Sequence, residues 1–224
     1  MAGNEVFPLQ IFDVKGKILS KPKQETLIDV RGMWYNSATK KMYANGYNET
    51  GWVEYAMDNE GNPTGTKILF EGLNQPGEQS VGTYDAAKNV VYFLSKNKIY
   101  TYSTATAQAT GDPVVLKSST PADTVKKEEP DSLDVFDFTD DKPLFNDNEY
   151  NNTTVIYTGI KDQEFGLLNI ADNRIDLFDR ATGTLKLKLI LPEGVPVNRM
   201  FNFSYANGMY WLFDKKTRAW KGYK

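Results

Sequence analysis

The sequence FGLLNIADNRIDLFDRATGTLKLKLIL, which spans Phe165 to Leu191, decides the fold class. It contains three runs rich in apolar residues, separated by two clusters of Asp, Asn and Gly. In the last run, three leucines alternate with Lys186, Lys188 and Ile190. Period-2 alternation between turn clusters is typical of half-buried antiparallel strands. The stretch therefore predicts a meander of three strands.

Other parts of the chain repeat this plan in weaker form. Residues 35–43 read YNSATKKMY and residues 84–92 read YDAAKNVVY, so each segment begins and ends with Tyr around an Asx-Ala-Lys turn. The two copies lie about one blade length apart, since propeller blades of four strands repeat every ~40–50 residues. Near the C-terminal end, Asn207-Gly208 separates two apolar-aromatic runs, which is the strongest short hairpin signal in the chain.

The segment 173–179 (NRIDLFD), followed by Thr182-Gly183, resembles the third strand and turn of NHL-like and SMP-30-like β-propeller repeats. The two Tyr-bounded segments look like the first two strands of such blades. The resemblance implies an all-β propeller built from antiparallel four-stranded meander blades. The resemblance to SMP-30-like lactonases would also imply a metal at the axis, held by Glu, Asn and Asp. The sequence identifies no residues that match these ligands, so the lactonase activity is not assigned to this chain.

The predicted architecture is a single domain over residues 1–224. At ~45 residues per blade, this length gives about five blades. The last unit, residues 197–224, has three predicted strands, whereas the N-terminal residues 6–29 contain spare ones. We therefore expect N- and C-terminal strands to close the ring, which hides the edges that an open sheet exposes. Residues 118–149 break the repeat and form either an elaborated blade or an inserted acidic loop.

The composition excludes several classes of chemistry. The chain has no Cys and no His, so disulfides, thiolate catalysis, Cys or His metal ligands and a Ser-His-Asp triad are absent. A net charge of −3 gives no electrostatic footprint for nucleic acid. No apolar run approaches the ~20 residues of a membrane span. A lack of Cys suits an exported bacterial protein and many cytosolic ones, and we expect an extracytoplasmic monomer.

Aromatic residues are unusually frequent, with 13 Tyr, 12 Phe and 4 Trp. On an exposed face their rings bury apolar area, and their polar tips anchor a ligand. The alternative is packing between blades, and the sequence alone favours that alternative for most of them. The candidate ligand-binding residues are Trp34, Tyr35, Trp52, Tyr55, Tyr210, Trp211 and Trp220.

Carboxylates are the other candidates. The acidic segment around Asp134, Asp137 and Asp140 could supply oxygen ligands to Ca²⁺, although the sequence favours a solvated acidic loop. Glu54 and Asp176 are acidic residues within predicted strands, where they could act as an acid–base pair or face solvent. No catalytic residue is assigned.

Two functions are compatible with these features. The first is a non-catalytic binding module that recognises a protein or a glycan through propeller loops and aromatic surface. The alternative is a carboxylate-based or Ca²⁺-dependent hydrolase with its site at the propeller axis. Carboxylates converging in an axial pocket favour the hydrolase, whereas an axis lined by apolar groups contradicts it. A third, weaker possibility is that the chain is part of a larger propeller completed by another copy or a longer partner.

Overall fold

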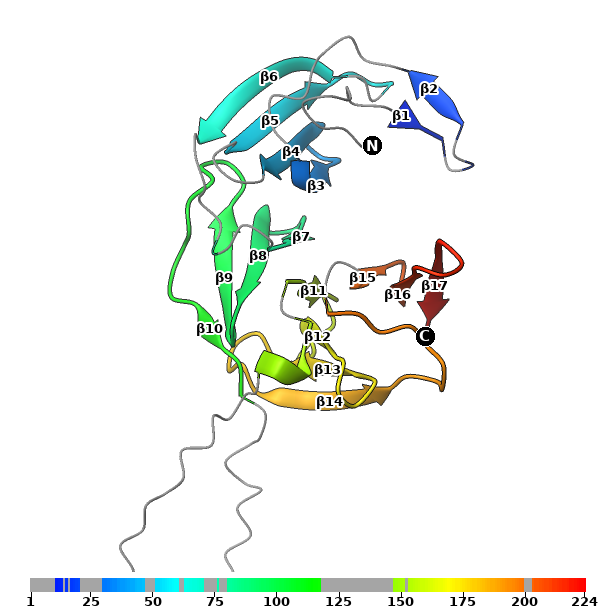
Figure 1. Ribbon diagram of the computed structural model, residues 1–224. Helices are drawn as coiled ribbons and strands as arrows, with labels where there is room; N and C mark the ends of the chain where they lie inside the picture. Colours follow the sequence, from blue (N-terminus) through cyan, green and yellow to red (C-terminus); the bar gives the residue numbers. More distant parts are fainter. Residues whose placement is uncertain are drawn as a thin grey trace, which may run out of the picture.

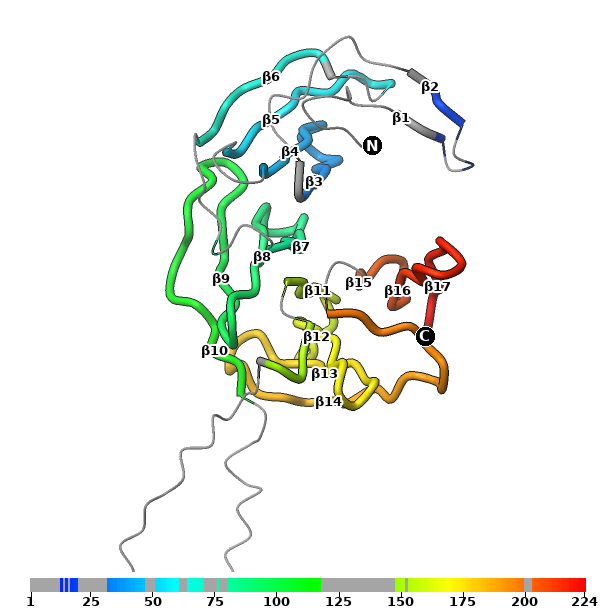
Figure 2. The backbone as a smooth tube through the Cα atoms, in the orientation of Figure 1, coloured from blue at the N-terminus to red at the C-terminus, as the bar shows by residue number. Residues whose placement is uncertain are grey.

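The computed structural model describes residues 11–13, 15, 17–20, 30–46, 51–60, 63–70, 76, 80–117, 147–151, 153–199 and 203–224. The described strands are all antiparallel within their sheets, and all of them except β1 and β2 form four successive blades of a β-propeller (Figure 1). The blades follow one another around an arc, as the chain trace also shows (Figure 2). The all-β class, the meander and the propeller arrangement predicted from the repeats are thus confirmed.

The first blade consists of β3 (Val30–Asn36), β4 (Lys41–Gly46), β5 (Trp52–Met57) and β6 (Pro63–Phe70). The second consists of β7 (Thr83–Asp85), β8 (Val90–Ser95), β9 (Lys98–Ser103) and β10 (Val114–Val115). The third consists of β11 (Ile156–Tyr157), β12 (Phe165–Asn169), β13 (Arg174–Phe178) and β14 (Leu185–Ile190). The fourth has β15 (Phe203–Ala206), β16 (Met209–Asp214) and β17 (Ala219–Tyr223). A separate hairpin pairs β1 (Ile11–Phe12) with β2 (Ile18–Ser20).

The two Tyr-bounded segments form the same hairpin in the first and second blades. Asn36 Oδ1 accepts hydrogen bonds from the backbone N–H groups of the turn at 3.0 and 3.1 Å, and Asp85 Oδ1 does the same at 3.1 and 3.3 Å. Lys40 and Asn89 both take a left-handed backbone before the second strand, with φ of 54° and 55°. The shared Asx turn therefore explains the repeat in the sequence. The Asn207-Gly208 turn between β15 and β16 is confirmed as well, with φ of 55° and 71°.

The stretch Phe165–Leu191 folds as β12, β13 and β14, as predicted. The expectation of half-buried strands is correct only for β14, whose residues are half-buried or exposed. All of β12 and nearly all of β13 are buried, because these strands lie inside the blade and neighbouring blades cover both of their faces. Separate apolar clusters fill the spaces between the first and second, second and third, and third and fourth blades.

The second and third blades are also joined at their outer strands. Lys117 N donates to Gly183 O at 2.8 Å, and Leu185 N donates to Lys117 O at 3.1 Å. Gly183 has φ of 69°, and a Cβ placed on it would lie 2.0 Å from the carbonyl oxygen of Val115. Only glycine fits this junction without a shift of the backbone.

A short 3₁₀ helix, η3 (Asp147–Glu149), precedes the third blade. Most of the predicted 118–149 insertion lies outside the described residues, and so do Asp134, Asp137 and Asp140. Among the described residues, no helix is long and apolar enough to cross a membrane.

Candidate functional site: the central pocket

The innermost strands of the second, third and fourth blades come together at the centre of the arc, with β11 beside both β7 and β15. Just before these strands, Val81 and Thr154 form a parallel bridge, in which Val81 N donates to Thr153 O at 2.8 Å. Tyr157 N donates to Thr83 Oγ1 at 3.1 Å. The inner segments of the second and third blades therefore run side by side, as the innermost strands around the axis of a propeller do.

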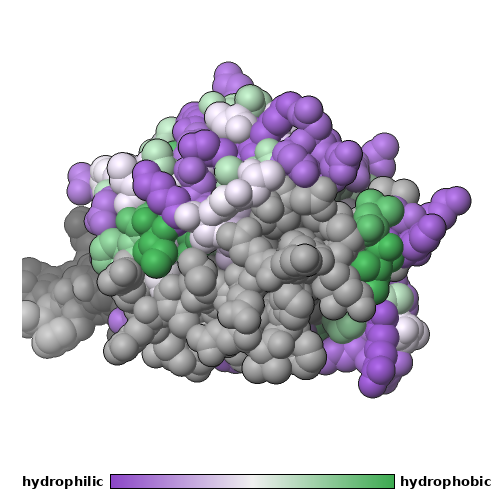
Figure 3. Space-filling view, turned by 90° about the horizontal axis from the view of Figure 1, so that it is seen from above, coloured by the Kyte–Doolittle hydropathy of each residue, from purple (hydrophilic) through white to green (hydrophobic). Residues whose placement is uncertain are grey.

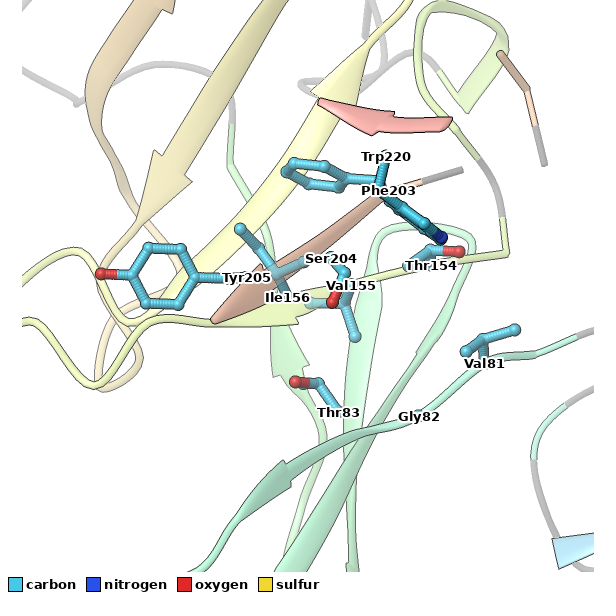
Figure 4. Close-up of a pocket in the computed structure, with 10 residues that line it drawn as sticks. All are labelled: Val81, Gly82, Thr83, Thr154, Val155, Ile156, Phe203, Ser204, Tyr205 and Trp220. Carbon is cyan, nitrogen blue, oxygen red and sulfur yellow. The ribbon is translucent and has the colours of Figure 1, made fainter. Parts of the chain in front are cut away.

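A pocket of about 330 Å³ lies at this meeting point (Figure 4). In Figure 4, Val81, Gly82 and Thr83 lie along one wall, and Phe203 and Trp220 lie on the other side. The ring of Tyr205 extends away from the other side chains. The complete lining is Val81, Gly82, Thr83, Thr154, Val155, Ile156, Phe203, Ser204, Tyr205 and Trp220.

The chemistry of this lining is apolar with a few hydroxyl groups. Val, Ile and Phe side chains supply the apolar surface, and Thr83, Thr154 and Ser204 supply alcohols. None of the described lining residues is Asp, Glu, Lys or Arg. The pocket therefore suits a neutral, largely apolar group and offers no carboxylate for acid–base chemistry or for a cation.

Asn151 holds one wall of the pocket in place. Its Oδ1 accepts hydrogen bonds from Thr153 N, Thr153 Oγ1 and Thr154 N, each at 3.1 Å. Its Nδ2 donates to the carbonyl of Asn198 at 3.2 Å, which ties the third blade to the segment that leads into the fourth. Because Asn151 is fully buried, these bonds fix the backbone at Thr154 before any ligand arrives.

A polar network links the second and third blades. Tyr92 Oη donates to Asp85 Oδ2 at 3.2 Å and accepts from an Arg180 guanidinium N–H at 3.2 Å. Arg180 N donates to Glu164 Oε2 at 3.1 Å. Burial, together with the Asp85 carboxylate, raises the pKa of Tyr157 to about 12, and burial raises the pKa of Tyr92 well above its usual value. These groups are engaged with one another and serve to join the blades.

The structure does not bring the seven predicted aromatic residues together. Trp52 and Tyr55 have no exposed area and Trp34 is buried, so these three pack in the core, the alternative that the sequence left open. Trp52 stacks on Tyr102, with ring centroids 5.8 Å apart. Tyr210 is buried between the third and fourth blades.

The remaining three are accessible. Tyr35 is 46% exposed on β3, and Trp211 is half-buried, its Nε1 donating to the carbonyl of Ala206 at 3.1 Å. Trp220 is 48% exposed and is the member of the seven that lines the central pocket. Sequence reasoning missed the other lining residues. Their inner position follows from the packing of blades, which leaves no local signal.

The two carboxylates considered from their strand positions do not form a pair. Glu54 forms an ion pair with Lys41 at 2.9 Å within the first blade. Asp176 is neither solvent-facing nor in a pocket: it is fully buried in the third blade, where it accepts hydrogen bonds from Tyr150 Oη at 2.7 Å and Arg174 Nε at 2.7 Å. Within the described ranges, no group of three or more Asp and Glu side chains is placed to hold a metal.

The surface seen from above in Figure 3 is mainly hydrophilic where described residues are visible, and its hydrophobic groups are separated. This view contains no broad apolar face among them. A pocket is therefore a better candidate for ligand contact than a flat apolar surface on this side.

Comparisons with known proteins give structural matches alone. No family model matches the chain, and no curated protein matches it. A solved structure of a nidogen/laminin complex matches with a TM-score of 0.44 and 8% identity over 95% of this chain and 83% of the other. A protein from Lactobacillus plantarum matches with a TM-score of 0.38 and 13% identity, covering 93% and 59% of the two chains. Saccharomyces cerevisiae Sqt1 matches with a TM-score of 0.37 and 12% identity, covering 95% and 66%.

Proposed function

We propose that the chain is a non-catalytic binding module that takes an apolar side chain of a protein ligand into the central pocket. The observation that carries this proposal is the pocket itself, with its apolar lining, its three alcohols and the half-exposed ring of Trp220. A volume of about 330 Å³ lies at the lower end of the range of roughly 300–1,000 Å³ for ligand pockets. An anchoring side chain fits such a volume better than a large ligand does.

The lining favours a protein ligand over a glycan. Sugar hydroxyls need many hydrogen-bond partners, and the described lining has no carboxylate, carboxamide or guanidinium side chain to provide them. Aromatic and aliphatic anchors in pockets, by contrast, carry most of the binding energy in protein interfaces. Trp220 is well placed for this role because its ring is accessible and adjoins Phe203 in the lining (Figure 4).

A hydrolase with an axial carboxylate pair receives no support from the described lining, which is the feature that distinguishes the two functions. Calcium binding by Asp134, Asp137 and Asp140 remains a separate proposal, as does membership of the NHL-like or SMP-30-like group.

We also propose that the ring closes through strands at the two ends of the chain, as a monomer. The fourth blade has three described strands where the others have four, and the β1–β2 hairpin belongs to none of the four blades. A two-stranded hairpin alone is marginally stable. Ile18 and Leu19 in β2 are exposed, and pairing with β17 would cover apolar area. A fifth blade would need these N-terminal strands together with residues outside the described ranges.

Cysteine cross-linking tests this closure cleanly because the chain has no Cys. Leu19→Cys combined with Lys221→Cys should form an intramolecular disulfide, whereas Leu19→Cys with Val115→Cys on the second blade should not. An intermolecular disulfide in the first pair would show that a second copy supplies the strand. Equal cross-linking in both pairs would contradict closure.

The binding proposal is tested by panning a random peptide library on the folded protein. Peptides that bind should share an apolar residue. Ser204→Trp fills the pocket from an exposed lining position, so it should lower the affinity for these peptides at least tenfold. Ser37→Trp, at an exposed turn of the first blade, is the matched control and should bind as the wild type does. Repeated panning without enrichment, or peptides indifferent to Ser204→Trp, would contradict the proposal. Glycan-array binding that Ser204→Trp abolishes would instead identify a glycan ligand.

A further inference from the structure

The chain contains two Asn-Gly pairs, and the fold places them in opposite surroundings. Asn207 and Gly208 form the whole two-residue turn between β15 and β16, and both are exposed. Asn45 and Gly46 end β4, where both are buried. Gly has no Cβ to shield its backbone nitrogen, so in both pairs this nitrogen can attack the side-chain carbon of the preceding Asn. A difference in reactivity between the pairs would therefore come from the fold.

The reacting groups of the exposed pair are free. Within the described part of the chain, neither the Asn207 carboxamide nor the Gly208 N–H has a hydrogen-bond partner. A Cβ placed on Gly208 would meet nothing within 4 Å, so there is open space beside this residue. Exposed turns open at a free-energy cost close to zero. Rotation of the peptide unit between the two residues can therefore bring the nitrogen to the carboxamide carbon.

The buried pair is held in its strand. Gly46 N donates to Gly51 O at 2.7 Å, and Asn45, which pairs with Trp52 of β5, has no exposed area. A deprotonated backbone nitrogen is a charge, which is costly to form away from water. Reaction at Asn45 thus requires β4 to open, and core strands open at a cost that approaches that of global unfolding.

We propose that Asn207 is a site of spontaneous modification, at which the exposed turn loses ammonia and becomes isoaspartate or aspartate. Hydroxide removes the proton of Gly208 N, and this nitrogen bonds to Cγ of Asn207. The Cγ–Nδ2 bond breaks, and Nδ2 takes up a proton and leaves as ammonia. Water then opens the resulting cyclic imide at either carbonyl. One opening gives aspartate with the original main chain, and the other gives isoaspartate, whose main chain runs through Cβ.

Isoaspartate changes the hairpin because it adds one atom to the main chain of a two-residue turn. With φ of 55° and 71°, the turn is of the type I′ kind, whose geometry sets the register of the flanking strands. Ser204 and Tyr205 of β15 lie just before this turn and line the central pocket. The modification therefore loosens the hairpin that forms one side of the pocket.

Incubation of the folded chain at mildly alkaline pH, followed by digestion and mass spectrometry that locates each conversion, tests the proposal. Asn207 should convert at least about a hundredfold faster than Asn45, because only Asn45 must wait for a core strand to open. In urea that unfolds the chain, the two residues should convert at similar rates. Retention of the Asn207 amide in the folded chain while it converts in urea would overturn the proposal, and so would equal rates for Asn207 and Asn45 in the folded chain.

Two variants test the effect on the hairpin. Asn207→Gly keeps a turn sequence suited to type I′ and has no carboxamide, so its stability in urea unfolding should not change during the incubation. Fresh Asn207→Asp carries the new charge on an unchanged main chain, so it should be more stable than incubated wild-type protein rich in isoaspartate. Equal losses of stability in the incubated wild type and Asn207→Gly would show that the damage lies elsewhere, and would overturn the loosening of the hairpin.

Discussion

Replacing Asp176 with Ala should destabilise the protein more than removing any exposed carboxylate does. Asp176 is fully buried in β13, where Arg174 donates to both of its oxygens, from Nε at 2.7 Å and from Nη2 at 3.2 Å. Tyr150 Oη donates to Oδ2 at 2.7 Å. Arg174 also forms an ion pair with the more exposed Asp172. The carboxylate thus joins the segment before the third blade to its centre.

The magnitude follows from what the substitution leaves behind. Asp176→Ala removes the charge that faces a guanidinium whose side chain is 14% exposed, and it deprives Tyr150 of its charged acceptor. Breaking a buried ion pair from one side costs about 3–5 kcal/mol. Tyr150→Phe removes one hydrogen bond to a charged group and should cost about 1.5–3 kcal/mol. Glu54→Ala breaks an ion pair to a Lys41 side chain that is 41% exposed, so it should cost ~1 kcal/mol or less.

Urea unfolding followed by circular dichroism measures these differences, provided that the m-values of the variants agree. The double variant Asp176→Ala with Tyr150→Phe should cost less than the sum of the single variants, because both changes remove the same hydrogen bond. A loss below about 1 kcal/mol for Asp176→Ala, equal to that for Glu54→Ala, would refute the reasoning that burial makes this pair costly to break.

Three further predictions concern the blade junction, alkaline pH and metal. Gly183 and Gly111 both have positive φ, so replacing either with Ala should cost roughly 1–2 kcal/mol for the left-handed backbone. Gly183→Ala should destabilise the fold more than Gly111→Ala, because the added Cβ clashes with the backbone at Gly183 and meets nothing at Gly111. Equal losses of stability in urea unfolding would count against a close junction between the blades. Burial raises the folded-state pKa of Tyr92, Tyr150 and Tyr157, so their contribution to the stability of the fold is present below the unfolded pKa of about 10 and is lost as the pH rises above it. Tyrosinate absorbance should therefore appear in two phases, the first from exposed tyrosines and the second together with unfolding. A single phase would disprove this prediction. If the three aspartates of the acidic segment bind Ca²⁺, the thermal midpoint should rise with Ca²⁺ and fall back with EDTA, by an amount equivalent to about 2.7 kcal/mol at a hundredfold excess over Kd, whereas an unchanged midpoint would exclude tight binding.

Local signals predicted much of the fold. The alternation in Phe165–Leu191, the two Tyr-bounded segments and Asn207-Gly208 all lie in the hairpins that they indicated. Each of these signals depends on a turn and its two flanking strands, and such contacts are close in sequence. The number of blades is different, because it depends on how the ends of the chain meet.

The candidate site was harder to predict because distant segments form it. Val81, Thr154 and Phe203 meet in one pocket although they belong to three blades. The burial of Trp52 could not be read from its neighbours, because the adjacent blade covers it, with Phe93 and Tyr102 against its ring. Asp176 looked like a solvent-facing residue in an alternating strand, and the partner that explains its burial, Tyr150, comes from the segment preceding the blade.

The most direct test of the central claim is quenching of Trp220 fluorescence by a neutral quencher, with and without a panned peptide. The Trp211→Phe variant leaves Trp220 as the one accessible tryptophan, because Trp34 and Trp52 are buried. If the central pocket binds the peptide, saturating peptide should protect Trp220 and lower the quenching constant severalfold, and Ser204→Trp should lose the binding itself. An unchanged quenching constant with peptide fully bound would place the ligand elsewhere and contradict the proposed site.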